Sequence, residues 1–367
     1  MGKKVLVVGA GIVGSAIADR LQAEGCTVTV FEGSIPAGGC TSTGLGAVLT
    51  FDDSPAQLQL TSWSARRWRT EDLGPGCERE TTGLIFMATN DEEKRELEAK
   101  AERFNSVGVK SERLDPAQLA RLEPALRPGL AGGLLVPESQ GVYQIGASRF
   151  LLGRALERGG SLLREQVREL VPGGVRTDRG RYHGDDVVLA AGLGITALLP
   201  ELPVRPRRGH VVITDRIPGL FRHQLMEMGY LTAAHGRADA AVAFSCQSRG
   251  TGQLLVGGSR EFVGLDPDVD REVLTQILRR ATWFLPGLAK WPVLRTWVGF
   301  RPCGPSNVPV VGPWPGREGL FVAGCHEGIG IMSCMGTAEL IAYHVTGIPT
   351  VLDTLPFLPN AGEHSHV

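Results

Sequence analysis

The first 32 residues constrain the fold of this chain more than any other segment. Residues 4–9 form an apolar run that ends in glycine, which is typical of a strand buried on both faces of a parallel sheet. Residues 12–24 place apolar side chains at helical spacing, and residues 26–32 are rich in β-forming residues. A strand, a helix and a second strand in this order predict a βαβ unit with a right-handed crossover.

The junction between the first strand and the helix reads GAGIVG and contains Gly9, Gly11 and Gly14. In a dinucleotide fold the first glycine makes a tight turn, the second lets the backbone approach a pyrophosphate, and the third lets the helix pack on the strand. The helix N-terminus offers N–H groups to the phosphates, and Glu32 can hold a ribose 2′-hydroxyl. The predicted dinucleotide-binding residues here are Gly9, Gly11, Ile12, Val13, Gly14 and Glu32. The alternatives are a purely structural βαβ unit and, for Glu32 alone, a solvated strand end.

After Glu32 the chain leaves the pattern of an uninterrupted NAD-binding domain and enters the loop GSIPAGGCTSTGLGAVL. This loop is rich in glycine and hydroxyl side chains, which can bond phosphate oxygens and pass along a large, flat ligand. The loop therefore favours FAD over NAD, with an ordinary polar turn as the alternative. The predicted cofactor-binding residues of the loop are Gly39, Thr41, Ser42, Thr43 and Gly46.

A second glycine-rich segment lies near the other end of the chain and reads GCHEGIGIMSCMG, residues 324–336. Its glycines indicate that a ligand or a neighbouring element comes very close to the backbone, just before a helix over 328–346. A sterically tight helix start without any ligand is the alternative.

The remaining pattern places buried, parallel-type strands at 185–192 and 319–324, and antiparallel-type runs over 205–262. Asn90 and Asp115 are the predicted N-caps of two further helices. A chain of 367 residues is long enough for two closely packed domains. The predicted fold class is α/β, with a Rossmann-like FAD-binding domain assembled from discontinuous segments and an α+β substrate domain with a mainly antiparallel sheet. The predicted boundaries are 1–80, 141–204 and 305–367 for the FAD-binding domain, and 81–140 and 205–304 for the substrate-binding domain.

Composition excludes several classes of partner. The net charge of −1 gives no sign of nucleic-acid binding, and no apolar run is long enough for a transmembrane segment. The seven cysteines form neither a CxxC pair nor a zinc-type spacing, and no metal-ligand cluster is evident. Because the N-terminus lacks a cleavable leader pattern, we expect a cytoplasmic protein.

The motifs VLVVGAGIVGSAIADRL, CTSTGLGA, DDVVLAAG, GFRPCGPSNVPVVG and GLFVAGCHEGIGI follow one another in an order that resembles the FAD-dependent amino-acid oxidoreductases. That family includes D-amino-acid, glycine and sarcosine oxidases, and the resemblance covers residues 4–347. The GCHEGIGI ending looks most like the catalytic β subunits of multi-subunit bacterial dehydrogenases that act on D-hydroxyproline, L-proline or opines.

The resemblance implies FAD as cofactor and oxidation of a C–N bond in a small amino or imino acid, by hydride transfer from the α-carbon to flavin N5, giving an imine. The substrate expected first is cis-4-hydroxy-D-proline or a related D-amino acid. The alternatives are a glycine- or sarcosine-type oxidase that uses oxygen, and an opine or L-proline dehydrogenase subunit within an electron-transfer complex. In such a complex exposed cysteines and FMN at a subunit interface are further expectations. An NAD-linked reductase and a non-enzymatic flavin-binding module also stay open.

The resemblance also implies site residues. Arg301 matches the arginine that binds the substrate carboxylate, Tyr230 would close the site, and His326 would face the substrate amine or a partner's cofactor. The alternatives are a paired structural arginine, a core tyrosine and a structural histidine. Sarcosine oxidases have a lysine where this chain has Ile331, which puts efficient oxygen reduction in doubt. The other implied cofactor-binding residues are Val167, Ala191, Gly192, Gly324, Glu327, Gly328, Ile329, Gly330 and Ile331.

Overall fold

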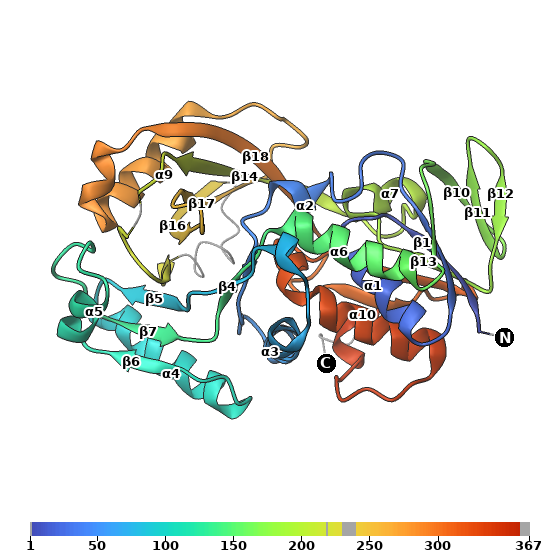
Figure 1. Cartoon of the computed structure of the whole chain (residues 1–367), viewed down its shortest axis with the longest axis horizontal. Coiled ribbons are helices and arrows are strands. Elements are labelled where there is room, and N and C mark those ends of the chain that lie inside the picture. Colours follow the sequence, from blue (N-terminus) through green and yellow to red (C-terminus); the bar gives the residue numbers. More distant parts are fainter. Residues whose placement is uncertain (1, 218, 230–239, 360–367) are drawn as a thin grey trace.

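The computed structural model describes residues 2–217, 219–229 and 240–359, and two large sheets dominate it (Figure 1). The strands of the first sheet are β1 (Lys4–Val8), β2 (Thr27–Phe31), β9 (Ser161–Leu163), β13 (Asp186–Leu189), β19 (Val310–Pro313) and β20 (Leu320–Gly324). They follow the order β19-β20-β13-β1-β2-β9, and every neighbouring pair is parallel except β19 with β20. Segments from both ends of the chain therefore lie in one sheet.

The strand β1 is buried on both faces, as its continuous apolar sequence predicts. Val5 and Val7 pack against three helices, whereas Leu6 and Val8 pack against a small antiparallel sheet. The helices are α1 (Ile12–Ala23), α6 (Gln144–Glu157) and α10 (Gly330–Thr346), and α3 (Pro55–Thr70) packs on α10. The small sheet consists of β10 (Val167–Val171), β11 (Gly174–Thr177) and β12 (Arg181–His183), with α7 (Ile195–Leu198) beside it.

The second large sheet has eight strands and occupies the left half of Figure 1. Its strands are β5 (Leu84–Ala88), β6 (Glu112–Leu114), β7 (Gly132–Val136), β14 (Arg205–Thr214), β15 (Gln224–Glu227), β16 (Ala240–Ser248), β17 (Leu254–Glu261) and β18 (Val293–Cys303). The order is β18-β14-β17-β16-β15-β5-β7-β6, and only the β15–β5 pair is parallel. The predicted fold class is thus confirmed, while the domain boundaries stay a prediction.

The two faces of the eight-stranded sheet have different neighbours. Ile85 and Met87 face the core that it shares with α5 (Pro116–Leu122) and α9 (Arg271–Phe284). Phe86 and Met226 belong instead to the core of the first sheet and its helices, together with Phe104 of α4 (Asp91–Ser106). The second face of this sheet is therefore directed toward the parallel sheet and any ligand held between the two.

Several helix starts are set by local side chains. Asn90 accepts a hydrogen bond from the Glu93 N–H at the start of α4, and Asp115 forms a reciprocal capping box with Gln118 at the start of α5. Both caps are confirmed predictions. A buried ion pair between Lys100 of α4 and Asp52 then ties this helix to the segment that follows β3 (Ala47–Val48).

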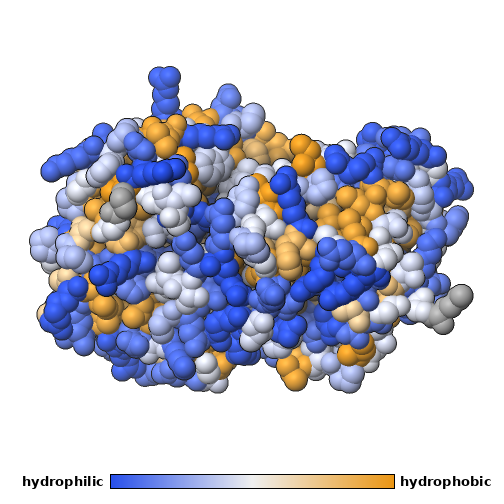
Figure 2. All heavy atoms as spheres, in the orientation of Figure 1, coloured by the Kyte–Doolittle hydropathy of each residue, from blue (hydrophilic) through white to orange (hydrophobic). Residues whose placement is uncertain are grey.

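Short elements complete the described chain. They are α2 (Cys40–Thr43), β4 (Glu80–Thr81), β8 (Gln140–Gly141), and the 3-10 turns η1 (Pro75–Cys77), η2 (Gly192–Gly194), η3 (Pro286–Lys290) and η4 (Leu355–Phe357). Polar side chains dominate the face drawn in Figure 2, and apolar side chains gather there only in separate groups. Within the described residues, every helix is too short or too polar to cross a lipid bilayer. The expectation of exposed cysteines is wrong, because six are buried and Cys40 is half-buried.

Candidate functional site

The turn between β1 and α1 is as crowded as its three glycines predict. Gly9 has a φ of +109°, and a methyl group placed on it would lie 2.5 Å from the Ala190 carbonyl oxygen. A methyl group on Gly14 would overlap the Gly9 carbonyl oxygen, because α1 packs directly on the strand that precedes it. Glycine at position 14 is therefore required by the contact between helix and strand.

The start of α1 lacks a cap from its own sequence. Gly11 is the N-cap residue and supplies no side-chain acceptor, and the Ile12 N–H donates instead to the Thr41 hydroxyl oxygen at 3.0 Å. A helix N-terminus without a local cap presents N–H groups and a partial positive charge to an anion. Val13 lies in the same first turn.

Glu32 follows β2 and points back at the same turn. Its carboxylate accepts hydrogen bonds from the Ala10 N–H at 3.0 Å and the Ser34 N–H at 2.8 Å. A carboxylate has about four acceptor positions, so these two bonds orient it and leave it able to accept from a ribose hydroxyl. Glu32 is half-buried and lies next to the Gly9–Gly14 turn, where a ribose hydroxyl would have to be.

Two hydroxyl groups of the hydroxyl-rich loop, residues 33–49, donate hydrogen bonds to carbonyl oxygens of the same loop. The Ser42 hydroxyl donates to the Gly38 and Gly39 carbonyls, both at 2.9 Å, and the Thr43 hydroxyl donates to the Cys40 carbonyl at 3.2 Å. These hydroxyl oxygens can still accept hydrogen bonds. A methyl group on Gly39 would meet no atom within 4 Å, so open space borders the loop at this residue.

The end of this loop lies between the C-terminal helix and the edge strand of the second sheet. A methyl group on Gly44 would lie 2.9 Å from Ile331 Cδ1, and one on Gly299 would overlap the Thr43 side chain. The indole N–H of Trp297 in β18 donates to the Thr43 carbonyl at 3.2 Å. The loop therefore contacts both the start of α10 and β18, the strand that carries Arg301.

Two glutamine side chains hold the loop from other elements. Gln144 Nε2 donates to the Gly44 carbonyl at 2.7 Å, and Gln247 Nε2 donates to the Leu45 carbonyl at 2.6 Å. Gly46, with a φ of +79°, passes so close to the Val142 carbonyl that a side chain would overlap it. Sequence reasoning missed both glutamines, because neither lies in a motif and their partners are about a hundred or more positions away in the chain.

The segment from Gly324 to Gly330 forms a left-handed turn between β20 and α10. Cys325 and Glu327 have φ values of +61° and +37°, and Gly328 has a φ of +85°. Positive φ is uncommon for residues other than glycine, and it recurs where function constrains the backbone. A methyl group on Gly330 would lie 3.8 Å from Val13 Cγ2, so the two glycine-rich turns at opposite ends of the chain meet.

The start of α10 also lacks a local cap. Ile329 is its N-cap residue and makes no side-chain cap, and the Ile329 N–H donates to the His326 carbonyl at 2.9 Å. Uncapped N–H groups at Gly330 and Ile331 can stabilise negative charge on a ligand edge in front of them. Ile331 itself packs against the loop at Gly44 and brings no cation to the site.

His326 turns into the protein. Its ring is 5% exposed, Nε2 lies 3.0 Å from the Thr337 hydroxyl, and burial lowers the pKa of the imidazole to about 4. A neutral, enclosed ring that is bonded to α10 supports the helix start. This placement speaks against direct contact of His326 with the substrate amine.

Arg301 lies on β18, on the sheet face that is directed toward the Gly324–Gly330 turn. Its Nη1 donates to the Ser259 carbonyl at 3.0 Å, and its guanidinium covers Gly209. A methyl group on Gly328 would lie 3.0 Å from Arg301 Cδ, so the arginine passes directly against the turn. The structure therefore brings the predicted carboxylate ligand next to the predicted cofactor-binding backbone.

Glu327 points toward the sheet rather than along the turn. Its Oε1 accepts from Arg207 Nη1 at 3.1 Å and lies 4.0 Å from Arg260 Nε. Burial, followed by the charge of Glu327, raises the pKa of the nearby Cys303 thiol to about 12. Arg207 and its neighbour Arg208 in β14 are both buried, at most 5% exposed, although a run of basic residues is ordinarily solvated.

Four predicted positions remain, and they lie in different parts of the chain. Ala191 and Gly192 follow β13 beside the Gly9 turn, and a methyl group on Gly192 would meet no atom within 4 Å. Val167 is the first residue of β10, in the small antiparallel sheet that packs on one face of the parallel sheet, and its side chain is buried. Tyr230 lies outside the described residues, and its role stays a prediction.

These features fit an FAD molecule. The two helix starts that lack a cap from their own N-cap residue suit its phosphates and flavin edge, and the oriented Glu32 carboxylate suits its ribose. The open space beside Gly39 and Gly192 leaves room along the backbone. Within residues 2–217, 219–229 and 240–359, no group of three metal-ligating side chains is present.

Comparisons with known proteins agree with this geometry. Residues 4–344 match the family model described as FAD dependent oxidoreductase. A glycine oxidase of Pseudomonas aeruginosa is 27% identical over 98% of this chain and 99% of its own, and the hydrogen cyanide synthase subunit HcnC of the same species is 29% identical over 76% and 66%. The crystal structure of L-proline dehydrogenase from P. horikoshii shares the fold, with a TM-score of 0.90 and 23% identity over 99% of this chain and 98% of that one. The chain therefore belongs to the FAD-dependent oxidoreductase family, and its cofactor is FAD.

Proposed function

We propose that this FAD-dependent enzyme oxidises the C–N bond of a small amino or imino acid. The observation that carries the proposal is the position of Arg301, which passes against Gly328 in the turn that leads into α10. A guanidinium is planar and permanently charged, so it binds a carboxylate in one orientation. A carboxylate held there would present its α-carbon toward the turn and the cofactor in front of it.

The surroundings of Arg301 restrict how its side chain moves. The Ser259 carbonyl accepts from Nη1, Gly209 provides the floor beneath the guanidinium, and Gly328 contacts the methylene groups. A preorganised cation loses little conformational freedom when it binds an anion. Bound FAD supplies the redox chemistry by accepting a hydride at N5. The residues of the chain orient the α-carbon and stabilise the charges.

Among substrates we favour cis-4-hydroxy-D-proline or a related D-amino acid, with an electron acceptor other than oxygen. The acceptor part of this proposal is supported by Ile331, whose apolar side chain packs against Gly44 where sarcosine oxidases have a lysine. Without that cation, the N–H groups and the dipole of α10 remain to stabilise negative charge there.

A glycine- or sarcosine-type oxidase is the second candidate. The identity with a glycine oxidase over nearly the whole length of both chains favours it. A role as one subunit of an electron-transfer complex, with FMN at an interface, has weaker support from the relative that is itself named a subunit.

The test is anaerobic mixing of the purified holoenzyme with a panel of cis-4-hydroxy-D-proline, D-proline, L-proline, glycine, sarcosine and an opine. The proposal expects at least one of them to bleach the visible flavin band, with the first compound fastest. Reduction by glycine alone would favour the second candidate, and reduction by none of them would refute the proposed reaction. An oxygen electrode and a dye acceptor, compared at the same substrate concentration, then identify the kind of acceptor.

A further inference from the structure

The turn from Gly324 to Gly330 adopts a backbone that its own sequence does not favour. Two of its residues with positive φ, Cys325 and Glu327, carry side chains. A left-handed conformation at such residues persists only where surrounding contacts hold it. Identifying those contacts shows which residues set the position of the helix start that follows.

The contacts come from three adjacent strands of the eight-stranded sheet. Arg207 of β14 donates to the Glu327 carboxylate at 3.1 Å, Arg260 of β17 approaches it at 4.0 Å, and the Glu327 N–H donates to the Pro302 carbonyl of β18 at 3.1 Å. The side chains of Arg207 and Arg260 are 7% and 9% exposed, and that of Glu327 is 21% exposed. An ion pair with so little solvent contact is screened weakly and fixes its partners firmly.

The same turn touches two parts of the candidate site. Gly328 follows Glu327 and lies against Arg301, and Ile329 and Gly330 begin the helix whose N–H groups face the expected flavin edge. A shift of Glu327 would therefore move the helix start relative to the arginine that holds the substrate.

We propose that Glu327 is a positioning residue, which acts through Arg207 to fix the start of α10 against the flavin and at a set distance from Arg301. The carboxylate itself is directed to Arg207 and Arg260 of the eight-stranded sheet. Its negative charge matters through its attachment to Arg207, and the length of its side chain matters as much as its charge. The consequence for catalysis rests on the proposed function, whereas the effect on bound flavin does not.

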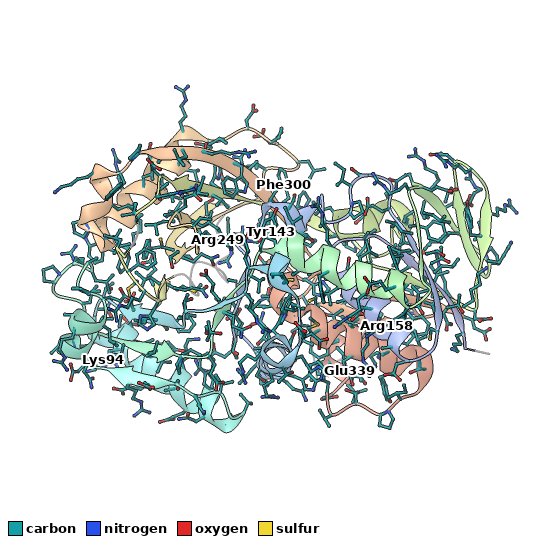
Figure 3. All side chains as sticks on the ribbon, in the orientation of Figure 1. Lys94, Tyr143, Arg158, Arg249, Phe300 and Glu339 are labelled. Carbon is teal, nitrogen blue, oxygen red and sulfur yellow. The ribbon has the colours of Figure 1, made fainter. Side chains whose placement is uncertain are left out.

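The decisive variant is Glu327→Asp, which keeps the charge but shortens the side chain by one methylene group. The matched control is Glu339→Asp, in the interior of α10, where the carboxylate accepts from Arg20 Nε at 2.9 Å (Figure 3). Both variants are purified with FAD bound, and the flavin midpoint potential is measured by dye-coupled reduction without any amino acid.

The proposal expects a lower flavin midpoint potential in Glu327→Asp and no change in Glu339→Asp. The reason is that a displaced helix start stabilises the reduced, negatively charged flavin less well. With a substrate that reduces the wild-type flavin, the limiting rate constant of reduction is expected to fall about tenfold, because a small displacement of the reacting groups is costly. Equal midpoint potentials in Glu327→Asp, Glu339→Asp and wild type would overturn the proposal.

A double-mutant cycle tests the role of Arg207. In an Arg207→Gln background, Glu327→Asp should cause no further change in midpoint potential, since the attachment is already lost. Additive changes would overturn action through Arg207. Should Arg207→Gln not fold, the comparison of Glu327→Asp with Glu339→Asp still decides. Should no amine reduce the wild-type flavin, the proposed reaction fails, but the potential measurements remain valid.

Discussion

The two glycine-rich turns that meet at the cofactor site are built in different ways. In the turn from Gly9 to Gly14, the positive φ falls on glycine and the close contact lies between α1 and the strand before it. In the turn from Gly324 to Gly330, positive φ also falls on Cys325 and Glu327, and ionic contacts to the other sheet hold the backbone. The first turn is therefore specified locally, and the second by the tertiary fold.

This difference indicates that the two turns have separate roles in the site. The N-terminal turn contacts other parts of the parallel sheet, such as the Ala190 carbonyl. It is therefore suited to hold the phosphates in a fixed position. The C-terminal turn contacts Arg207 and Arg301 of the eight-stranded sheet. Changes in the first turn should therefore affect cofactor retention, and changes in the second should affect substrate and flavin reactivity.

The largest effect is expected from Gly14→Ala. The added methyl group would overlap the Gly9 carbonyl oxygen, so α1 must move away from β1 and the phosphate site is lost. We expect FAD affinity to fall about a hundredfold, consistent with the cost of overpacking. Calorimetric titration of the apoprotein with FAD measures this. The control Gly153→Ala, in the interior of α6 with no atom within 4 Å of the new methyl group, should bind FAD normally. Equal FAD affinity in both variants would contradict the local account of the first turn.

Arg301→Lys separates substrate binding from cofactor binding. A lysine retains the charge but loses the bidentate fork, and we expect kcat/KM to fall roughly a hundredfold while FAD stays bound. Steady-state kinetics with the best substrate of the panel measures the loss. Arg295→Lys, at an exposed position of the same strand, is the matched control. An unchanged kcat/KM in Arg301→Lys would remove Arg301 as the carboxylate ligand.

Gly328→Ala tests the contact between the second turn and Arg301. The φ of +85° disfavours alanine by about 1–2 kcal/mol, and the methyl group would press on Arg301 Cδ at 3.0 Å. We expect KM for the substrate to rise about tenfold with little loss of FAD. Gly347→Ala carries a similar backbone penalty at a φ of +77° but meets no atom within 4 Å, so it isolates the contact with Arg301. Equal KM values in the two variants would show that the contact does not matter.

The smallest effect concerns pH and His326. Burial lowers the pKa of its imidazole from 6.5 to about 4, so between these values the unfolded chain binds a proton that the folded protein does not. The free energy of unfolding should therefore fall with decreasing pH in this window, by at most about 1.4 kcal/mol per pH unit from this group.

In His326→Gln this part of the pH dependence should disappear, since the amide can still bond the Thr337 hydroxyl without titrating. Urea unfolding midpoints between pH 6.5 and 4 measure it, with His183→Gln on the exposed end of β12 as control. A pH dependence in His326→Gln as steep as in wild type would contradict the buried, neutral state of this histidine.

The sequence predicted the features whose causes are local. The apolar run of β1, the glycines of the first turn and the caps at Asn90 and Asp115 each act within a few residues, so their patterns could be interpreted directly. The helix after the second glycine-rich segment, predicted over 328–346, was recognised in the same way, and in the structure it begins at Gly330.

Long-range contacts escaped prediction. Nothing near Glu327 indicates that its carboxylate binds Arg207, which lies 120 positions away, or that the ring of His326 turns inward to Thr337. The two glutamines that hold the hydroxyl-rich loop were missed for the same reason. The contact between Glu327 and Arg207 depends on how β14 and β18 pair, and that pairing has no signature in either strand alone.

Both glycine-rich turns are expected to contact the same FAD molecule. Hydrogen–deuterium exchange of the apoprotein, followed at increasing FAD concentrations, tests it most directly. We expect amides in residues 9–14 and 324–331 to become protected together, with the same dependence on FAD concentration. Protection of one segment while the other stays unchanged would contradict it.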